Sequence, residues 1–83
     1  MTVGFDVALN ALKAGRMCIR TGWNGKGIFI GIQFRQEHSH MTQPYLYIDT
    51  TGLLSDNVDA PRSRVPWLAS QTDLLAEDWI ILG

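Results

Sequence analysis

The glycine-rich stretch GWNGKG, residues 22–27, carries side chains of the kinds that bind a nucleotide. Trp23 offers an aromatic face for a base, Lys26 a cation for a phosphate, and Asn24 an amide that fixes orientation. Gly25 and its neighbouring glycines would let backbone N–H groups approach an anion closely. The stretch is neither a Walker nor a dinucleotide-binding fingerprint. Its spacing also fits a β-hairpin in which Asn24 and Gly25 form the turn and Trp23 packs on the core, so both interpretations stay open.

A second set of polar and aromatic candidates follows Pro66. Its members are Trp67, Ser70, Gln71, Thr72 and Asp73. Trp67 could stack on a base or anchor the core, and the hydroxyl and amide groups could bind ribose or phosphate. Ser70 and Asp73 also have the spacing of a helix N-cap and its reciprocal acid, which is the role we favour for Asp73. Arg20, before the glycine-rich stretch, adds a second cation for a phosphate.

Catalytic and metal-binding constellations are scarce. His38 and His40 could bind zinc from one side of a strand, but no cysteine or clear third ligand completes a tetrahedral site. Cys18 lies in an apolar segment, where a small buried thiol is expected rather than a nucleophile. The acidic residues of the C-terminal segment are Asp73, Glu77 and Asp78. Two of them could pair for acid–base chemistry, but helix capping and solvation account for all three. We therefore expect no catalytic residue, no metal and no cofactor.

The elements that must position these residues indicate an α+β fold. Apolar positions recur at helical spacing from Phe5 to Ala14, and Gly15 is a natural stop for that N-terminal helix. A short helix begins after Ser70 and precedes the last strand. The predicted strands cover residues 17–20, 28–34, 45–50 and 79–82, with the first two joined as an antiparallel pair by the glycine-rich turn. We expect one domain, residues 1–83, built on a small antiparallel sheet with a mobile loop at 55–63.

The composition is typical of a globular protein in a reducing cytoplasm. The 83 residues are 46% hydrophobic and 18% charged, which excludes disordered and fibrous classes. No apolar run approaches the roughly 20 residues that span a bilayer, so no membrane association is expected. The single cysteine cannot form an internal disulfide, and the N-terminal residues have no signal-peptide pattern.

The net charge of −1 conceals two oppositely charged halves. Residues 1–36 carry five basic residues and one acidic residue, a net +4, whereas residues 37–83 carry two basic and seven acidic residues, a net −5. Such faces are usually solvated or pair with each other. DNA is not expected as a partner because its binding needs a broad basic stripe, but a small anion in a local basic pocket fits.

Three segments together carry a family resemblance. They are F-x-x-A-L-x-x-L-K-x-G at residues 5–15, R-x-GWNGKG at 20–27 and PWLASQTDLLAEDW at 66–79. This combination resembles the second Thoeris anti-defence family and covers both ends of nearly the whole chain. Residues 35–63 contain no matching motif, and Leu74 stands where a methionine is common.

The resemblance implies a phage protein that acts as a molecular sponge in the cytoplasm of the infected bacterium. Members of that family bind a cyclic nucleotide immune signal, notably glyco-cyclic ADP-ribose, without degrading it, and some relatives hold cyclic di- or trinucleotides. The family fold is a small antiparallel sheet with helices, assembled as a homotetramer with ligand pockets between protomers. By this resemblance the ligand-binding residues come from the glycine-rich stretch and from the segment that contains Trp67 and Ser70.

Two functions of other classes remain as alternatives. The hydroxyl cluster and the pair His38 and His40 would suit a nucleotide-cleaving enzyme. The hydrophobic motifs and the near-neutral charge would suit a non-catalytic protein-interaction module.

Overall fold

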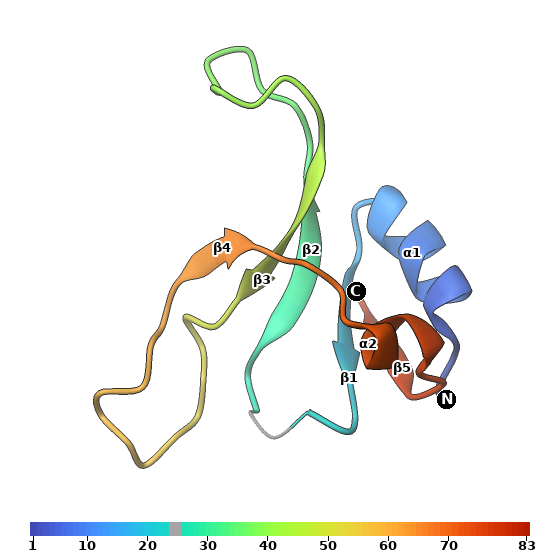
Figure 1. The fold of residues 1–83 in the computed structure, drawn as a ribbon, viewed down its shortest axis with the longest axis vertical. Coiled ribbons are helices and arrows are strands. Elements are labelled where there is room, and N and C mark those ends of the chain that lie inside the picture. The colour runs from blue at the N-terminus through green and yellow to red at the C-terminus, as the bar shows by residue number, and fades with distance from the viewer. Residues whose placement is uncertain (24–25) are drawn as a thin grey trace.

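The protein folds as an antiparallel sheet with helices on one side, as Figure 1 shows for residues 1–23 and 26–83, the part of the chain that the computed structural model describes. In chain order the elements are α1 (Phe5–Lys13), β1 (Met17–Arg20), β2 (Phe29–Gln33), β3 (Tyr45–Asp49), β4 (Arg64–Pro66), α2 (Gln71–Leu75) and β5 (Trp79–Leu82). The described strands lie in the order β4-β3-β2-β1-β5, and each neighbouring pair is antiparallel. The predicted α+β class, with an N-terminal helix and a short helix before the last strand, is confirmed.

Helix α1 forms and ends where the sequence predicts. Ala8, Ala11 and Leu12 recur at helical spacing and are buried where α1 packs against β1, β2 and β5. Gly15 donates its N–H to the carbonyl of Leu12 at 2.9 Å, and Arg16 donates to the carbonyl of Ala11 at 3.0 Å. These two bonds are those of a Schellman motif, which satisfies carbonyls at the end of the helix.

The pairing of β5 with β1 brings distant motifs together. Arg20 lies opposite Trp79, and Cys18 lies opposite Ile81. On the other side of β5, Val3 forms an isolated bridge to Trp79, with N–H to carbonyl distances of 2.9 and 3.0 Å. The start of the glycine-rich turn therefore lies beside the residues that precede β5.

Side-chain alternation along the strands separates a buried face from an open one. Cys18, Ile30 and Trp79 are fully buried on the face that packs against α1. The alternate residues point to the opposite face, on which neither helix of the described chain packs. We call this opposite side the open face. Its apolar members, all half-buried, are Met17, Ile19, Phe29, Tyr45, Tyr47, Ile80 and Leu82.

Strand β4 is an element that the sequence does not predict. It contains three exposed residues, Arg64 to Pro66. It lies at one edge of the described sheet, where it pairs with β3. A strand this short carries too few residues for period-2 alternation to be visible, and its proline argues against a strand. Its pairing with β3 is set by tertiary contact.

Two connections project from the body of the fold. Figure 1 shows the segment between β2 and β3, residues 34–44, extending away from the sheet, and the segment before β4 extending in another direction. Nearly all residues of the predicted loop at 55–63 are exposed, and the mobility of that loop stays a prediction. In the described part of the chain, no helix is long and apolar enough to cross a membrane.

Candidate functional site

Arg20 links the two sequence motifs through two ion pairs. Its Nη1 atom lies 2.8 Å from Oδ1 of Asp73, and its Nε atom lies 2.9 Å from Oδ1 of Asp78. The side chain of Arg20 is 19% exposed, and the two carboxylates are 13% and 28% exposed. Hydrogen bonds, first to Asp78 and then to Asp73, raise the pKa of the guanidinium above its ordinary value. Arg20, which the sequence predicts to bind a phosphate, is thus held by two carboxylates that largely balance its charge.

Asp73 has the capping role that its spacing predicts. Its backbone N–H donates to Oγ of Ser70 at 3.1 Å, and its Oδ2 accepts the N–H of Ser70 at 3.0 Å, which completes a capping box. The hydroxyls of Ser70 and Thr72 lie 2.8 Å apart, and Gln71 is exposed. Burial alone would raise the pKa of Asp73, but the bonds from Ser70 and Arg20 lower it on balance.

The two candidate tryptophans both pack on a third. The ring of Trp79 is fully buried and donates its Nε1–H to the carbonyl of Asp73 at 3.0 Å. Trp23 lies edge-on to it with ring centroids 5.5 Å apart, and Trp67 does so at 6.1 Å. Phe5 completes the cluster at 5.3 Å from Trp79. Trp23 and Trp67 are half-buried, so each combines core packing with an accessible part of its ring.

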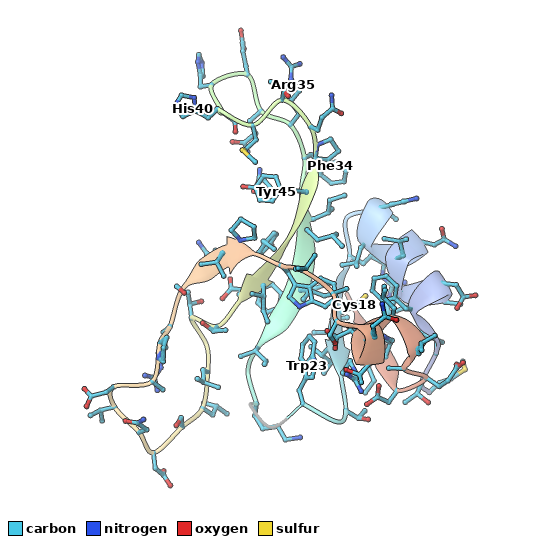
Figure 2. All side chains as sticks on the ribbon, viewed as in Figure 1. Cys18, Trp23, Phe34, Arg35, His40 and Tyr45 are labelled. Atoms are coloured by element: carbon cyan, nitrogen blue, oxygen red, sulfur yellow. The ribbon has the colours of Figure 1, made fainter. Side chains whose placement is uncertain are left out.

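A small pocket with a volume of about 140 Å³ lies at the glycine-rich turn. Its lining residues are Ile19, Arg20, Thr21, Trp23, Lys26, Gly27, Ile28 and Ile80. Trp23 and Lys26 therefore meet at one cavity, whose apolar walls come from three isoleucines of β1, β5 and the residue before β2. Figure 2 shows Trp23 near the end of β1. Trp67, Ser70, Gln71 and Thr72 do not line this pocket.

The second half of the glycine-rich turn is attached to the connection that follows β3. The carbonyl of Lys26 accepts the N–H of Leu54 at 2.9 Å, and the exposed Lys26 side chain extends from that bridge. Gly27 has a φ of 86°, and a Cβ at this position would overlap the carbonyl oxygen of Gly52. Glycine is therefore required at Gly27 for its backbone conformation and for space. The candidates Asn24 and Gly25 lie outside the described residues.

A larger pocket, with a volume of about 330 Å³, lies on the open face away from these motifs. It is lined by Gln33, Tyr45, Tyr47, Arg64, Val65 and Pro66. The Nε atom of Arg64 lies 2.7 Å from Oδ2 of the buried Asp49, whose pKa is lowered to about 2 first by the Thr51 hydroxyl and then by Arg64. None of these residues was a candidate from the sequence, although the alternation of Tyr45 and Tyr47 places both on one face of the sheet.

The histidines and the cysteine do not gather into a catalytic or metal-binding cluster. His38 and His40 are exposed on the projecting segment between β2 and β3, where Figure 2 labels His40. Within residues 1–23 and 26–83, no group of three or more His, Cys, Asp or Glu side chains is placed to hold a metal. Cys18 is buried, as predicted, and its thiol donates to the carbonyl of Ala8 at 3.6 Å. Burial raises the pKa of this thiol, despite a smaller opposing effect of Arg16.

The fold and the site together define a class of protein. It is a small α+β protein in which the turn after β1 lies beside the segment before β5, next to a pocket and a cluster of aromatic rings. The family model of the Thoeris anti-defense 2-like domain matches residues 3–82, and the chain belongs to this family. It is 32% identical over 85 residues to "Thoeris anti-defense 2" of Bacillus phage SP01, covering 98% of this chain and 96% of that protein. The family inferred from the three motifs is confirmed, and membership supports a phage anti-defence role for this chain.

Proposed function

We propose that the protein is a sponge that binds a cyclic nucleotide immune signal and sequesters it without cleaving it. Glyco-cyclic ADP-ribose is the first candidate ligand, and cyclic di- or trinucleotides are the next. The observation that carries the proposal is the meeting of Trp23 and Lys26 at one pocket with apolar walls. An aromatic face, a cation and apolar walls are the complement of a base joined to phosphate, and membership of an anti-defence family supports the same role.

In this proposal the two ends of the ligand meet different residues. The accessible part of the Trp23 ring would stack on a base, and the exposed ammonium of Lys26 would pair with a phosphate. Arg20 also lines the pocket, but because both of its ion pairs are made within the protein, its contribution is mainly to hold the wall in place. A single exposed lysine contact contributes only about 1 kcal/mol, whereas nanomolar affinity needs about 12 kcal/mol. Stacking and further hydrogen bonds must therefore supply most of the affinity.

The remaining candidates form the rim of the proposed site. The hydroxyls of Ser70 and Thr72 and the exposed amide of Gln71 lie on the segment that follows Trp67. Ser70 already caps α2, so Gln71 and Thr72 are the better placed to contact ribose or phosphate. Asp73 is engaged by Ser70 and Arg20, which leaves capping as its main role.

We further propose that the complete site forms between copies of the chain in a homotetramer. The pocket at the turn holds about 140 Å³, below the roughly 300 Å³ at which ligand sites usually begin. Two residues of its wall, Ile19 and Ile80, belong to the open face. A second protomer packed on that face would enlarge and close the pocket. It would also bury apolar surface that an 83-residue chain alone leaves accessible.

Sequestration without cleavage is supported by the state of the potential acid–base groups. Asp73 and Asp78 are each bonded to Arg20, and the pKa of each is lowered, which disfavours a general acid at neutral pH. The thiol of Cys18 is buried. The site of action in this proposal is the cytoplasm of the infected bacterium, where the signal is made.

The test is a binding and recovery experiment with glyco-cyclic ADP-ribose. The protein is incubated with the ligand, passed through a filter that retains protein, denatured by heat and analysed by chromatography. We expect the ligand to stay with the native protein and to return intact after denaturation. Lys26→Ala should weaken binding by about fivefold, the effect of losing about 1 kcal/mol. Lys13→Ala removes an exposed lysine of α1, away from the pocket, and is the matched control that should not change binding. Cleaved products would favour the nucleotide-cleaving enzyme, and an unretained ligand would favour the protein-interaction module.

A further inference from the structure

Asp78 lies outside the glycine-rich turn but accepts several hydrogen bonds from the residues where that turn begins. Its Oδ2 atom accepts the N–H of Gly22 at 2.8 Å and the hydroxyl of Thr21 at 3.2 Å. Its Oδ1 atom accepts Nε of Arg20 at 2.9 Å, and its backbone carbonyl accepts the N–H of Thr21 at 3.1 Å. The turn closes with a bond from the N–H of Trp23 to the carbonyl of Arg20 at 3.3 Å. One residue before β5 thus contacts each residue from 20 to 22.

The glycine at Gly22 is explained by this carboxylate. A Cβ added at Gly22 would lie 2.9 Å from Oδ2 of Asp78, closer than a side-chain carbon approaches an oxygen without displacement. Because the φ of Gly22 is not positive, its backbone conformation alone does not require glycine. A side chain at this position would instead displace the Asp78 carboxylate oxygen from its bond to the turn. Close approach, a backbone N–H bond and an ion pair therefore all converge on one carboxylate.

Asp78 is absent from the wall of the pocket at the turn, whereas Arg20, Thr21 and Trp23 belong to it. We propose that Asp78 is a positioning residue: by fixing residues 20–22 it sets the orientation of Trp23 and hence the shape of the pocket. This inference rests on the proposed function only for its effect on ligand affinity. Its structural part, the fixing of the turn, is measurable without a ligand.

The size of the effect follows from the kind of bonds involved. Hydrogen bonds to a charged group are about twice as strong as neutral ones, and replacing the carboxylate by an amide places an NH₂ group against donors. Asp78→Asn should therefore accelerate amide hydrogen exchange at Gly22 by at least about tenfold, with no comparable change at Cys18 inside β1. It should weaken binding of glyco-cyclic ADP-ribose by about tenfold, because Trp23 is no longer pre-oriented.

Two further variants distinguish a positioning role of Asp78 from a general loss of stability. Gly22→Ala keeps the carboxylate of Asp78 but moves it away from the backbone of residue 22. It should therefore also accelerate exchange at residue 22 and weaken ligand binding. It also takes the place of Asp78→Asn if that variant does not fold. The double variant should weaken binding no more than the stronger single change, because both act through the same contact. Glu77→Gln removes a neighbouring exposed acid and should change neither exchange at Gly22 nor affinity by more than about twofold.

The outcomes distinguish this inference from the proposed function. Unchanged exchange at Gly22 in Asp78→Asn would overturn the positioning role, whatever the ligand does. Faster exchange with unchanged affinity would also overturn it, because the turn would then be loosened without consequence for the pocket. A parent protein that binds no cyclic nucleotide while Gly22 exchange responds as expected would overturn the proposed function and leave the fixing of the turn established.

Discussion

Trp23 stands edge-on to Trp79, with ring centroids 5.5 Å apart and an angle of 81° between the ring planes. This arrangement means that Trp23 serves the core and lines the pocket at the turn with the same ring. Edge-to-face aromatic pairs add roughly 1 kcal/mol beyond the area that they bury. Ligand affinity and stability are therefore coupled at this residue, and experiments must measure both.

Trp23→Ala should lower both stability and affinity, whereas Trp67→Ala should lower mainly stability. Each ring packs edge-on against Trp79, but only Trp23 lines the pocket. We expect each substitution to reduce the free energy of unfolding by about 2 kcal/mol, since the rings are half-buried. Urea unfolding and titration with glyco-cyclic ADP-ribose measure the two effects. Equal losses of affinity in both variants would contradict the assignment of Trp23 as the stacking residue.

Arg20→Lys should destabilise the protein although it preserves charge. A lysine ammonium cannot reproduce the two separate bonds that the guanidinium makes to Asp73 and Asp78. The expected loss is about 1 to 2 kcal/mol, because these ion pairs are only partly exposed. Denaturant unfolding provides the measurement. Arg16→Lys, at an exposed position just before β1, is the control, and a similar loss there would show that the ion pairs of Arg20 do not matter.

Stability should decline at acid pH in a window set mainly by Asp49. The pKa of this carboxyl is about 2 in the folded protein against an ordinary value of 3.8, lowered first by the Thr51 hydroxyl and then by Arg64. A lowered folded-state pKa stabilises the fold fully above the unfolded value, and this contribution is lost as the pH falls from about 4 through about 2. The lowered pKa values of Asp73 and Asp78 act in the same direction.

Melting temperatures measured between pH 7 and pH 2 test this expectation. The parent protein should keep a nearly constant melting temperature down to about pH 5 and then lose several degrees. Asp49→Asn should start lower at pH 7 and decline less steeply, because the asparagine does not titrate. A parallel decline in both proteins would assign the acid sensitivity to other groups.

Gly27→Ala should damage the turn more than Gly52→Ala, although the two glycines face each other. Gly27 has a φ of 86° and would place a Cβ against the backbone of Gly52, whereas a Cβ at Gly52 would lie 3.1 Å from the carbonyl oxygen of Gly27. Strain of this kind costs about 1 to 3 kcal/mol. Thermal unfolding measures the cost, and the affinity of Gly27→Ala should fall as well because Lys26 is the adjacent residue. A larger effect at Gly52 would be inconsistent with this turn geometry.

Ile80→Lys should dissociate the proposed homotetramer. Ile80 lies on the open face and also lines the pocket at the turn, so a charge there would disfavour packing of a second protomer. Native mass spectrometry gives the subunit number directly. Leu75→Lys, on the 78% exposed Leu75 of α2, is the matched control and should leave assembly unchanged. A tetramer that survives Ile80→Lys would place the interface elsewhere.

Several elements follow from local sequence because short-range forces determine them. The apolar spacing around Ala8 and Leu12 specifies α1, and the reciprocal pair Ser70 and Asp73 specifies the start of α2. Strand β4 is not predictable from the sequence, because three exposed residues are too few to show an alternating pattern and one of them is a proline.

The candidate site could be predicted in its components but not in its arrangement. Trp23, Lys26 and Arg20 were selected by residue type and spacing, and all three line one pocket. The sequence could not show that Arg20 is held by carboxylates from residues 73 and 78, because those contacts join positions 53 and 58 residues apart. Asp78 looked like a solvated acid for the same reason.

The sequence by itself determined the α+β class, the family and the residue types available for binding. Those properties depend on periodicity, capping and motif composition, which are local or additive along the chain. Only the tertiary structure decided that Trp23 and Trp67 share Trp79 as a support and that Asp78 reaches the N–H of Gly22. The physical reason is the pairing of β5 with β1, which places Arg20 opposite Trp79. This pairing brings the glycine-rich turn and the segment before β5 side by side although they are far apart in the sequence.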